Sequence, residues 1–133
     1  MAVTRASNEV RRAAAFRVAL RGFTRETEQA ARQAGLTPQR YLLLLMVKGA
    51  EDGSEQATIS ELGQRLYLAQ STVTELVNRA AQAGLVSRRT SPDDGRVVYV
   101  QLTEKGDRRF AQAFRALADE RHALHEVVTT LDA

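Results

Sequence analysis

The 133-residue sequence contains no cysteine, which excludes disulfide bonds, thiolate metal ligands and thiol redox chemistry. Its apolar residues make up 44% of the chain but fall in short periodic clusters. No stretch approaches the roughly 20 consecutive apolar residues that span a bilayer, and the N-terminus lacks an apolar segment followed by a cleavage site. We therefore expect a soluble cytoplasmic protein that contacts no membrane.

Groups that would serve catalysis or hold a cofactor are also scarce. The sequence has no glycine-rich phosphate loop, no HExxH motif and no Ser-His-Asp order. Its two histidines, His122 and His125, are three positions apart and can share one helix face, where a metal site is conceivable. Because no third ligand has a firm spacing, we interpret them as exposed or partner-facing side chains. We expect neither an enzyme nor a bound cofactor or metal.

The balance of charge favours a polyanionic partner only weakly. The net charge is +3 and the isoelectric point is about 9.8. Residues 1–36 carry seven arginines against three glutamates, whereas residues 58–103 carry five arginines against four acidic residues. Residues 58–103, which contain the clearest binding motif, are thus close to neutral. The motif rather than the charge has to support the prediction that this segment binds a partner.

A long amphipathic helix is predicted at the start of the chain. Ser7 or Thr4 can cap a helix that runs from about residue 8 to residue 34, with Gly35 as its C-terminal stop. Its apolar stripe, with residues recurring every three or four positions, includes Phe16, Leu20 and Phe23. At ~1.5 Å per residue the helix would be about 40 Å long, more than a chain of this size can cover.

Another long helix is predicted from Thr103 nearly to the C-terminus. Its stripe alternates in steps of four and three residues, a heptad pattern with one charged member, Arg121. The apolar members are Phe110, Phe114, Leu117, Leu124, Val128 and Leu131. We expect two copies of the chain to pair through both end helices, with Arg121 reaching solvent or pairing with an acidic residue such as Glu120 or Glu126 of the partner.

The middle of the chain begins with a helix that should be central and buried. Thr37 and Pro38 form a helix start, because proline at the first helical position loses no hydrogen bond. Residues 41–47 are apolar on all sides, which predicts a buried helix. Residues 51–55 are polar and contain glycine, and we expect a surface loop there.

Residues 58–83 have the spacing of a helix-turn-helix. Thr58 and Glu61 form a capping-box pattern that opens a short helix, and a further helix is expected over about residues 70–83. Apolar residues form the inner faces of both helices, and Gly63 lies where the helices approach most closely. The outer face of the second helix presents polar side chains suited to base edges and phosphates, namely Gln70, Ser71, Thr72, Thr74, Glu75, Asn78 and Arg79. The alternative is an ordinary helical hairpin with a solvated polar face.

Two strands are predicted next, over about residues 85–89 and 97–102, and the second alternates with a period of two. They enclose a turn-rich loop that ends at Arg96. Such a wing favours DNA binding, because a helical hairpin has no need of one. Arg88 and Arg89, on the first strand, are expected to contact phosphates regardless of sequence.

In this order and spacing, the motifs resemble those of the MarR-type transcriptional regulators, over about residues 36–106. They are Thr37-Pro38, Ile59-Ser60-Glu61-Leu62, Ser71-Thr72-Val73-Thr74, Gly84-Leu85-Val86, Asp94-Gly95-Arg96 and Leu102-Thr103-Glu104-Lys105-Gly106. The resemblance implies a homodimer in which Arg96 reaches the minor groove, while Asp94 holds the wing tip in shape and Gly95 permits its turn. The alternative for Arg96 is a solvated loop arginine.

Three residues depart from the pattern of that family. Tyr67 occupies a turn position that usually carries glycine, so we expect the turn to form without that residue's freedom at positive φ. Ala69 replaces the usual serine cap, which leaves Gln70 or Ser71 to cap the helix. Glu75 stands where a basic residue is common, and its carboxylate either accepts a hydrogen bond from cytosine N4 or repels phosphate.

The resemblance also implies an effector pocket between the dimerisation helices and the DNA-binding region. The side chains proposed for it are Phe16, Phe23, Tyr41, Leu45 and Met46, for which plain core packing is the alternative.

The fold expected is mainly α with a small β-wing, a winged helix-turn-helix. Residues 1–36 and 104–133 form dimerisation helices around the DNA-binding region of residues 37–103, in one intertwined domain. The function expected is that of a sequence-specific regulator, a repressor that binds a pseudo-palindromic operator in double-stranded DNA as a homodimer and is released by a small-molecule effector. The alternatives are a constitutive architectural DNA binder and a winged-helix module for protein interaction.

Overall fold

A computed structural model describes residues 5–130 of the chain, as six helices and one antiparallel sheet of three strands. In chain order the elements are α1 (Asn8–Gln33), α2 (Pro38–Lys48), β1 (Gln56–Thr58), α3 (Ile59–Leu66), α4 (Gln70–Gln82), β2 (Val86–Thr90), β3 (Val98–Leu102), α5 (Glu104–Ala116) and α6 (Ala118–Thr130). The mainly helical fold with a small wing is the predicted one. Two residues named above, Thr4 and Leu131, lie outside the described range.

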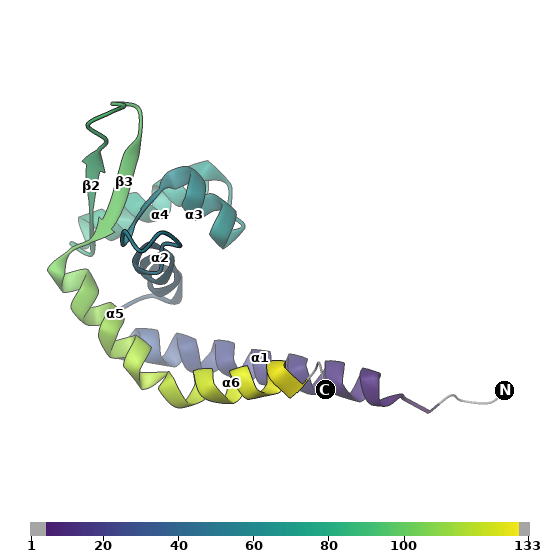
Figure 1. Ribbon diagram of the computed structural model, residues 1–133. Helices are drawn as coiled ribbons and strands as arrows, with labels where there is room; N and C mark the ends of the chain where they lie inside the picture. The colour runs from purple at the N-terminus through teal and green to yellow at the C-terminus, as the bar shows by residue number, and fades with distance from the viewer. Residues whose placement is uncertain (1–4, 131–133) are drawn as a thin grey trace.

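The sheet has the order β1-β3-β2, and β2 with β3 forms the predicted wing (Figure 1). Val86 pairs with Leu102 at the base of the wing and Thr90 with Val98 nearer its tip. The remaining strand of the sheet, β1, is too short to show an alternating pattern and was not predicted from the sequence. It pairs with β3 opposite Tyr99 to Gln101. It also ends in Thr58, whose side chain accepts from the Glu61 N–H at 3.2 Å and completes the predicted capping box.

The core of the winged helix unit, residues 37–103, is centred on α2. Leu43, Leu44 and Val47 of this helix are fully buried, and α2 contacts the sheet and the two following helices. The helix starts as predicted, with Thr37 accepting from the Arg40 N–H at 3.2 Å and Pro38 in the first turn. Burial on all sides was predicted, and this is wrong at Leu42, which is 40% exposed.

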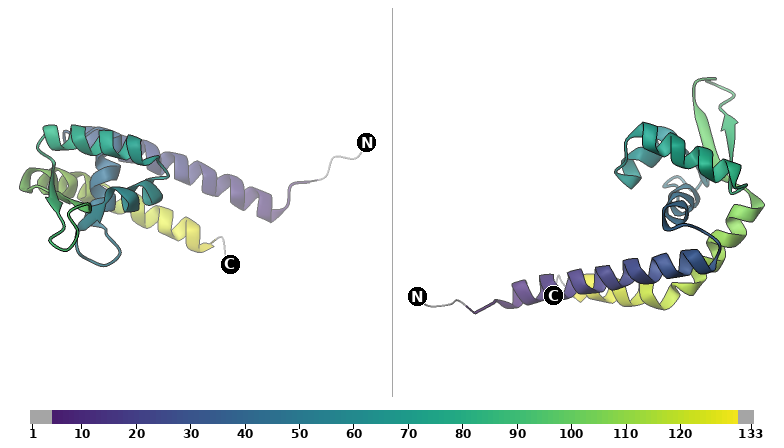
Figure 2. Two further views of the ribbon diagram at one scale, coloured as in Figure 1. Left: turned by 90° about the horizontal axis from the view of Figure 1, so that it is seen from above. Right: turned by 180° about the vertical axis from the view of Figure 1, so that it is seen from behind.

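Helices α1 and α6 form a helical arm that extends away from the winged helix unit, and the two lie side by side (Figure 2). Ser7 caps α1 by accepting from the Val10 N–H at 3.2 Å. Only Ala30 and Ala31 are buried in α1, and α6 has no buried residue. Within residues 5–130, no helix has both the length and the apolar character needed to cross a bilayer.

The last predicted helix is in fact two, because α5 ends at Ala116 and α6 begins at Ala118. The residue between them, Leu117, is only 2% exposed, and Phe110 is only 6% exposed. The Phe110 ring stacks on Tyr41 of α2 at a centroid distance of 5.6 Å. The prediction that these side chains need a partner to cover them is therefore wrong, since their own chain covers them.

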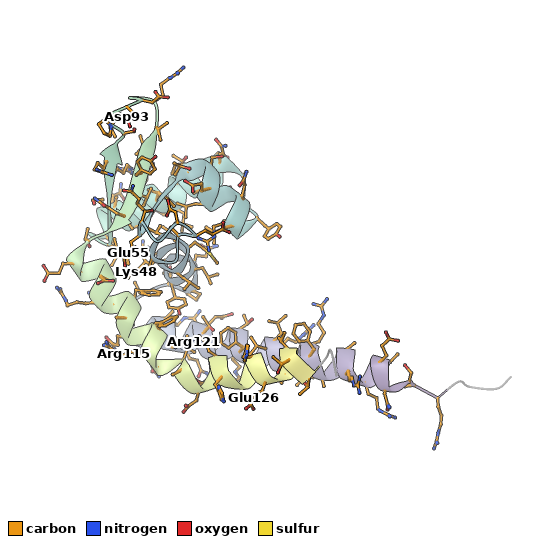
Figure 3. All side chains as sticks on the ribbon, in the orientation of Figure 1. Lys48, Glu55, Asp93, Arg115, Arg121 and Glu126 are labelled. Atoms are coloured by element: carbon orange, nitrogen blue, oxygen red, sulfur yellow. The ribbon has the colours of Figure 1, made fainter. Side chains whose placement is uncertain are left out.

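The prediction for Arg121 is also wrong, because this side chain turns inward to the junction of α5 and α6. Its guanidinium lies over the Phe114 ring, 3.6 Å from the centroid, and donates to the Phe114 carbonyl oxygen. That carbonyl lies in the last turn of α5, where a cation complements the helix dipole. Figure 3 shows Arg121 directed toward this junction.

Candidate nucleic-acid interface

The proposed recognition helix, α4, has one buried face and one exposed face. Val73, Val77 and Ala80 are buried against the rest of the winged helix unit. The polar residues predicted to contact DNA are all exposed, namely Gln70, Ser71, Thr72, Thr74, Glu75, Asn78 and Arg79. The geometry meets the requirement for entry into a major groove, while contact with DNA stays a prediction.

The turn between α3 and α4 is tight, as its glycine predicts. A Cβ atom on Gly63 would lie 3.0 Å from the Leu68 carbonyl oxygen, so the two segments approach too closely for a larger residue. Tyr67 makes the turn with φ +56° and ψ +44°, in the left-handed region, although it is not glycine. The turn therefore forms without glycine, as the sequence predicts, but it still uses a positive φ. Tyr67 is 94% exposed, so its side chain meets no obstacle in this conformation.

The start of α4 has no side-chain cap. Ala69 is the N-cap residue and no side chain accepts from the first turn, so the prediction that Gln70 or Ser71 replaces the missing serine is wrong. The first N–H groups of α4 therefore remain available to an acceptor from outside the chain.

Glu75 has a role that the sequence analysis did not foresee. Its carboxylate accepts from the Arg79 guanidinium at 2.7 Å, one helical turn away, and both side chains are about two-thirds exposed. This pair partly neutralises the one cation on the outer face of α4. An exposed pair of this kind stabilises a helix by only about 0.3–0.5 kcal/mol, so a phosphate can compete for the arginine.

Two arginines on β2 are oriented by neutral partners. Arg88 donates to the Asn78 side-chain oxygen, and Arg89 donates to Gln56 at 2.9 Å. The Arg89 guanidinium also lies 6.0 Å from the centroid of the Tyr99 ring. Amide partners hold a guanidinium in place without cancelling its charge, so both side chains keep their full attraction for phosphate.

The wing tip is held by the carboxylate of Asp94. It accepts from the Arg96 backbone N–H at 3.0 Å and from the Arg96 Nε at 3.3 Å, while the Arg96 side chain is 93% exposed. Figure 3 marks Asp93 at the tip. Gly95 has no positive φ, and a Cβ there would meet nothing within 4 Å. The expectation that Gly95 permits the turn is therefore wrong, and the hydrogen bonds of Asp94 shape the loop.

Arg40, which was not predicted as a site residue, adds a cation beside the recognition helix. It lines an open groove of about 210 Å³ between the start of α2 and the side of α4, together with Thr72 and Arg79. Its guanidinium makes no hydrogen bond or ion pair with any residue in the range 5–130. The Thr37-Pro38 helix start was the available signal, since it places the following residues at an exposed helix end.

The five side chains proposed for an effector pocket do not share one environment. Tyr41 is 3% exposed and stacked on Phe110, so it belongs to the core. Burial raises the pKa of its phenol, and the charge of Arg121 lowers it in part. Leu45 and Met46 pack at the margin of the core, and Phe16 and Phe23 are half-buried on the arm.

The histidines lie on α6, where His122 is 3.3 Å from the Glu126 carboxylate. In the part of the chain that the structure describes, no three His, Asp or Glu side chains gather in a way that would hold a metal ion.

Comparison with known sequences connects this arrangement to one family. Residues 34–97 match the sequence profile of the MarR family. The chain is 30% identical over 121 residues to the HTH-type transcriptional regulator YkoM of Bacillus subtilis, which covers 79% of the chain and 75% of that protein. It is 33% identical over 86 residues to the organic hydroperoxide resistance transcriptional regulator of the same organism, covering 65% of the chain but 56% of that protein. The matched part is about half the length of several such relatives.

Solved structures share the fold at lower sequence identity. A mutant MarR from E. coli, complexed with operator DNA, has a TM-score of 0.70 and 22% identity, and the match covers 87% of this chain and 84% of that one. The AbsC regulator of Streptomyces coelicolor has a TM-score of 0.72 and 21% identity, and the match covers 98% and 91% of the two chains. The shared fold includes both the winged helix unit and the helical arm.

Proposed function

The chain belongs to the MarR family, and on this basis we propose that it is a sequence-specific transcriptional regulator that binds double-stranded DNA as a homodimer. We propose further that it is a repressor whose operator is a pseudo-palindrome. The wing arginine Arg96 enters the minor groove, and α4 enters the major groove. A repressor acts where the chromosome lies, so we place the protein in the cytoplasm.

One observation carries this proposal, namely the division of α4 into a fully buried face and a fully exposed polar face beside a wing. Val73, Val77 and Ala80 fix the helix to its own core, whereas the polar residues of its other face remain exposed. Arg88 and Arg89 lie on the adjoining strand with their charges uncompensated. This arrangement suits a ligand with both base edges and phosphates.

A mobility-shift assay tests the proposal on the DNA that adjoins the protein's own gene, against shuffled duplexes of the same composition. We expect selective binding to two half-sites about 10 bp apart, centre to centre. A plot of the logarithm of the association constant against the logarithm of the salt concentration should be linear. Its slope should be about −0.9 for each phosphate that the protein neutralises. Equal binding to all duplexes at moderate salt would indicate an architectural binder, and the absence of binding would indicate a module for protein interaction.

Release by a small-molecule effector is part of the proposal, but fewer side chains can line the pocket than the sequence suggested. The accessible side chains are Phe16, Phe23, Leu45 and Met46, because Tyr41 is committed to the core. A thermal-shift screen of a diverse set of small molecules tests this. A compound that raises the melting temperature and also weakens the operator complex supports regulation by an effector, whereas a constitutive repressor would respond to none.

A further inference from the structure

The recognition helix ends in a Schellman motif. Gly84 takes a φ of +75°, its N–H donates to Ala81 at 3.0 Å, and the Leu85 N–H donates to Ala80 at 2.9 Å. The motif satisfies the last carbonyl groups inside the helix. It also turns the chain sharply, so that the carbonyl groups of residues 83–85 lie beside the start of α5.

The N-cap residue and the first turn of α5 bind all three of those carbonyl oxygens. Lys105 Nζ donates to Ala83 at 2.8 Å. The Thr103 hydroxyl donates to Gly84 at 2.6 Å, and the Thr103 backbone N–H donates to Leu85 at 3.0 Å. The ammonium group also places a positive charge at the C-terminus of α4, where it complements the helix dipole.

The same few residues begin α5. The Thr103 hydroxyl accepts from the Gly106 N–H at 3.0 Å, so one side chain caps α5 and holds the end of α4. A Cβ atom on Gly106 would overlap the Leu85 carbonyl group, so the two backbones are in direct contact there. We call these contacts, between residues 83–85 and 103–106, the α4–α5 joint.

Beyond the joint, α5 leads from the wing to the helical arm (Figure 1). Arg109 donates to the Gly35 carbonyl oxygen at 3.1 Å, which ties α5 to the end of α1. Besides the stacking of Phe110 on Tyr41, a further link between α5 and the winged helix unit is the ion pair of Asp107 with Lys48, at 2.9 Å. That pair reaches α2 rather than α4, and its side chains are 48% and 35% exposed, so it holds the recognition helix only indirectly.

We infer that Thr103 and Lys105 are positioning residues that fix the direction of α4 relative to α5 and the arm, and so set the separation of the two recognition helices. This inference rests on the proposed function, because it requires two copies reading two half-sites. The N-terminal end of α4, where Ser71, Thr72 and Thr74 lie, is the end opposite the joint. In a helix of 13 residues, about 20 Å long, a tilt of about 10° moves the far end by about 3.4 Å, which is the rise of one base pair.

The first test is a series of operators in which the distance between half-sites is changed by one or two base pairs. We expect the wild type to lose about tenfold or more in affinity with each change, because a misplaced half-site forfeits the gain from linked binding. The Lys105→Met and Thr103→Val variants should lose only about twofold per change, at a lower affinity for the best spacing.

Three matched variants serve as controls. Lys105→Arg and Thr103→Ser keep a donor at each position and should restore the preference for one spacing. Asp107→Asn removes the ion pair to α2, leaves the joint intact and should keep the wild-type preference. Variants that weaken binding equally at every spacing would overturn the inference. The contacts of the joint would then contribute to stability alone.

A second measurement needs no DNA and uses the absence of cysteine from the chain. A spin label on Gln64→Cys, an exposed position of α3, reports the distance between the two winged helix units of a dimer. We expect a narrow distribution in the wild-type background and a broad one with Lys105→Met or Thr103→Val. An unchanged width, or the absence of any distance between copies, would overturn the inference. Wild-type protein that shows the narrow distance but no sequence-specific binding would instead overturn the proposed function.

Discussion

The winged helix unit and the helical arm use apolar residues in opposite ways. The unit encloses its own core, in which Leu43, Leu62, Val73 and Val100 are completely buried. The arm leaves apolar side chains exposed, and Val18 of α1 has an exposed fraction of 71%. In α6 no residue is buried.

This difference separates a part of the chain that buries its apolar residues from a part that leaves several of them exposed. A buried Leu or Val contributes about 1.5–3 kcal/mol, so the unit gains most of its stability within the chain. The arm gains little, because its two helices cover each other only along one side. Its uncovered apolar surface fits the proposed pairing with a second copy.

The most damaging change to the arm should act on assembly and not on folding. We expect Val18→Asp combined with Val128→Asp to abolish the dimer, since both side chains are exposed in the single chain, at 71% and 43%. Operator affinity should then fall by about 10²–10⁴-fold, because two linked half-sites become one. Light scattering and a mobility shift measure the two effects. The melting temperature of the winged helix unit should hardly move.

The control for this pair is Val18→Thr with Val128→Thr, which keeps shape and adds no charge. Leu117 is unsuitable for such a test, because it is buried in its own chain. A double Asp variant that remained dimeric would place the assembly surface elsewhere.

In the winged helix unit, we expect a substitution in the core to affect folding rather than assembly. Leu43→Ala removes a fully buried side chain of α2 and should lower the free energy of unfolding by about 2–5 kcal/mol. Urea denaturation followed by circular dichroism measures this change. The protein that remains folded should still bind its operator. A loss below about 1 kcal/mol would mean that α2 is not the centre of the core.

Local sequence patterns predicted the winged helix unit well, because the signals there act over short distances. The capping box at Thr58, the helix start at Thr37 and the close approach at Gly63 each depend on neighbouring residues, and each is present. The strand β1 escaped notice because its pairing partner lies more than 40 positions later in the chain.

The arm was predicted less well for the same reason. The heptad spacing of Phe110, Leu117 and Leu124 suggested one continuous helix facing one partner. Phe110 and Leu117 belong instead to the core of their own chain. The helix bends between α5 and α6, and this bend places them there. Periodicity reports that a face is apolar but not which surface covers it. The position of Arg121 over Phe114 depends on this bend and could not be foreseen.

The wing allows a change that affects DNA binding alone. Arg96→Ala should weaken operator binding by about 1–3 kcal/mol per groove contact. It should leave the melting temperature unchanged, because the side chain is 93% exposed. Fluorescence anisotropy with labelled operator measures the affinity. Asp94→Ala should have a smaller effect of the same sign, since it loosens the loop without removing the cation. Operator binding by Arg96→Ala as tight as that of the wild type would contradict the minor-groove role.

The smallest effect is expected at Tyr67, where the winged helix unit holds a non-glycine residue at φ +56°. The left-handed conformation costs an L-residue about 1–2 kcal/mol, and glycine avoids that cost while adding about 0.5–1 kcal/mol of backbone entropy. We therefore expect Tyr67→Gly to be more stable than Tyr67→Ala by a few tenths to about 1 kcal/mol. Both variants lose the ring, which is 94% exposed, so their difference isolates the backbone conformation. Urea denaturation of the pair measures it. If the alanine variant were the more stable, the turn between α3 and α4 would not require positive φ at this position.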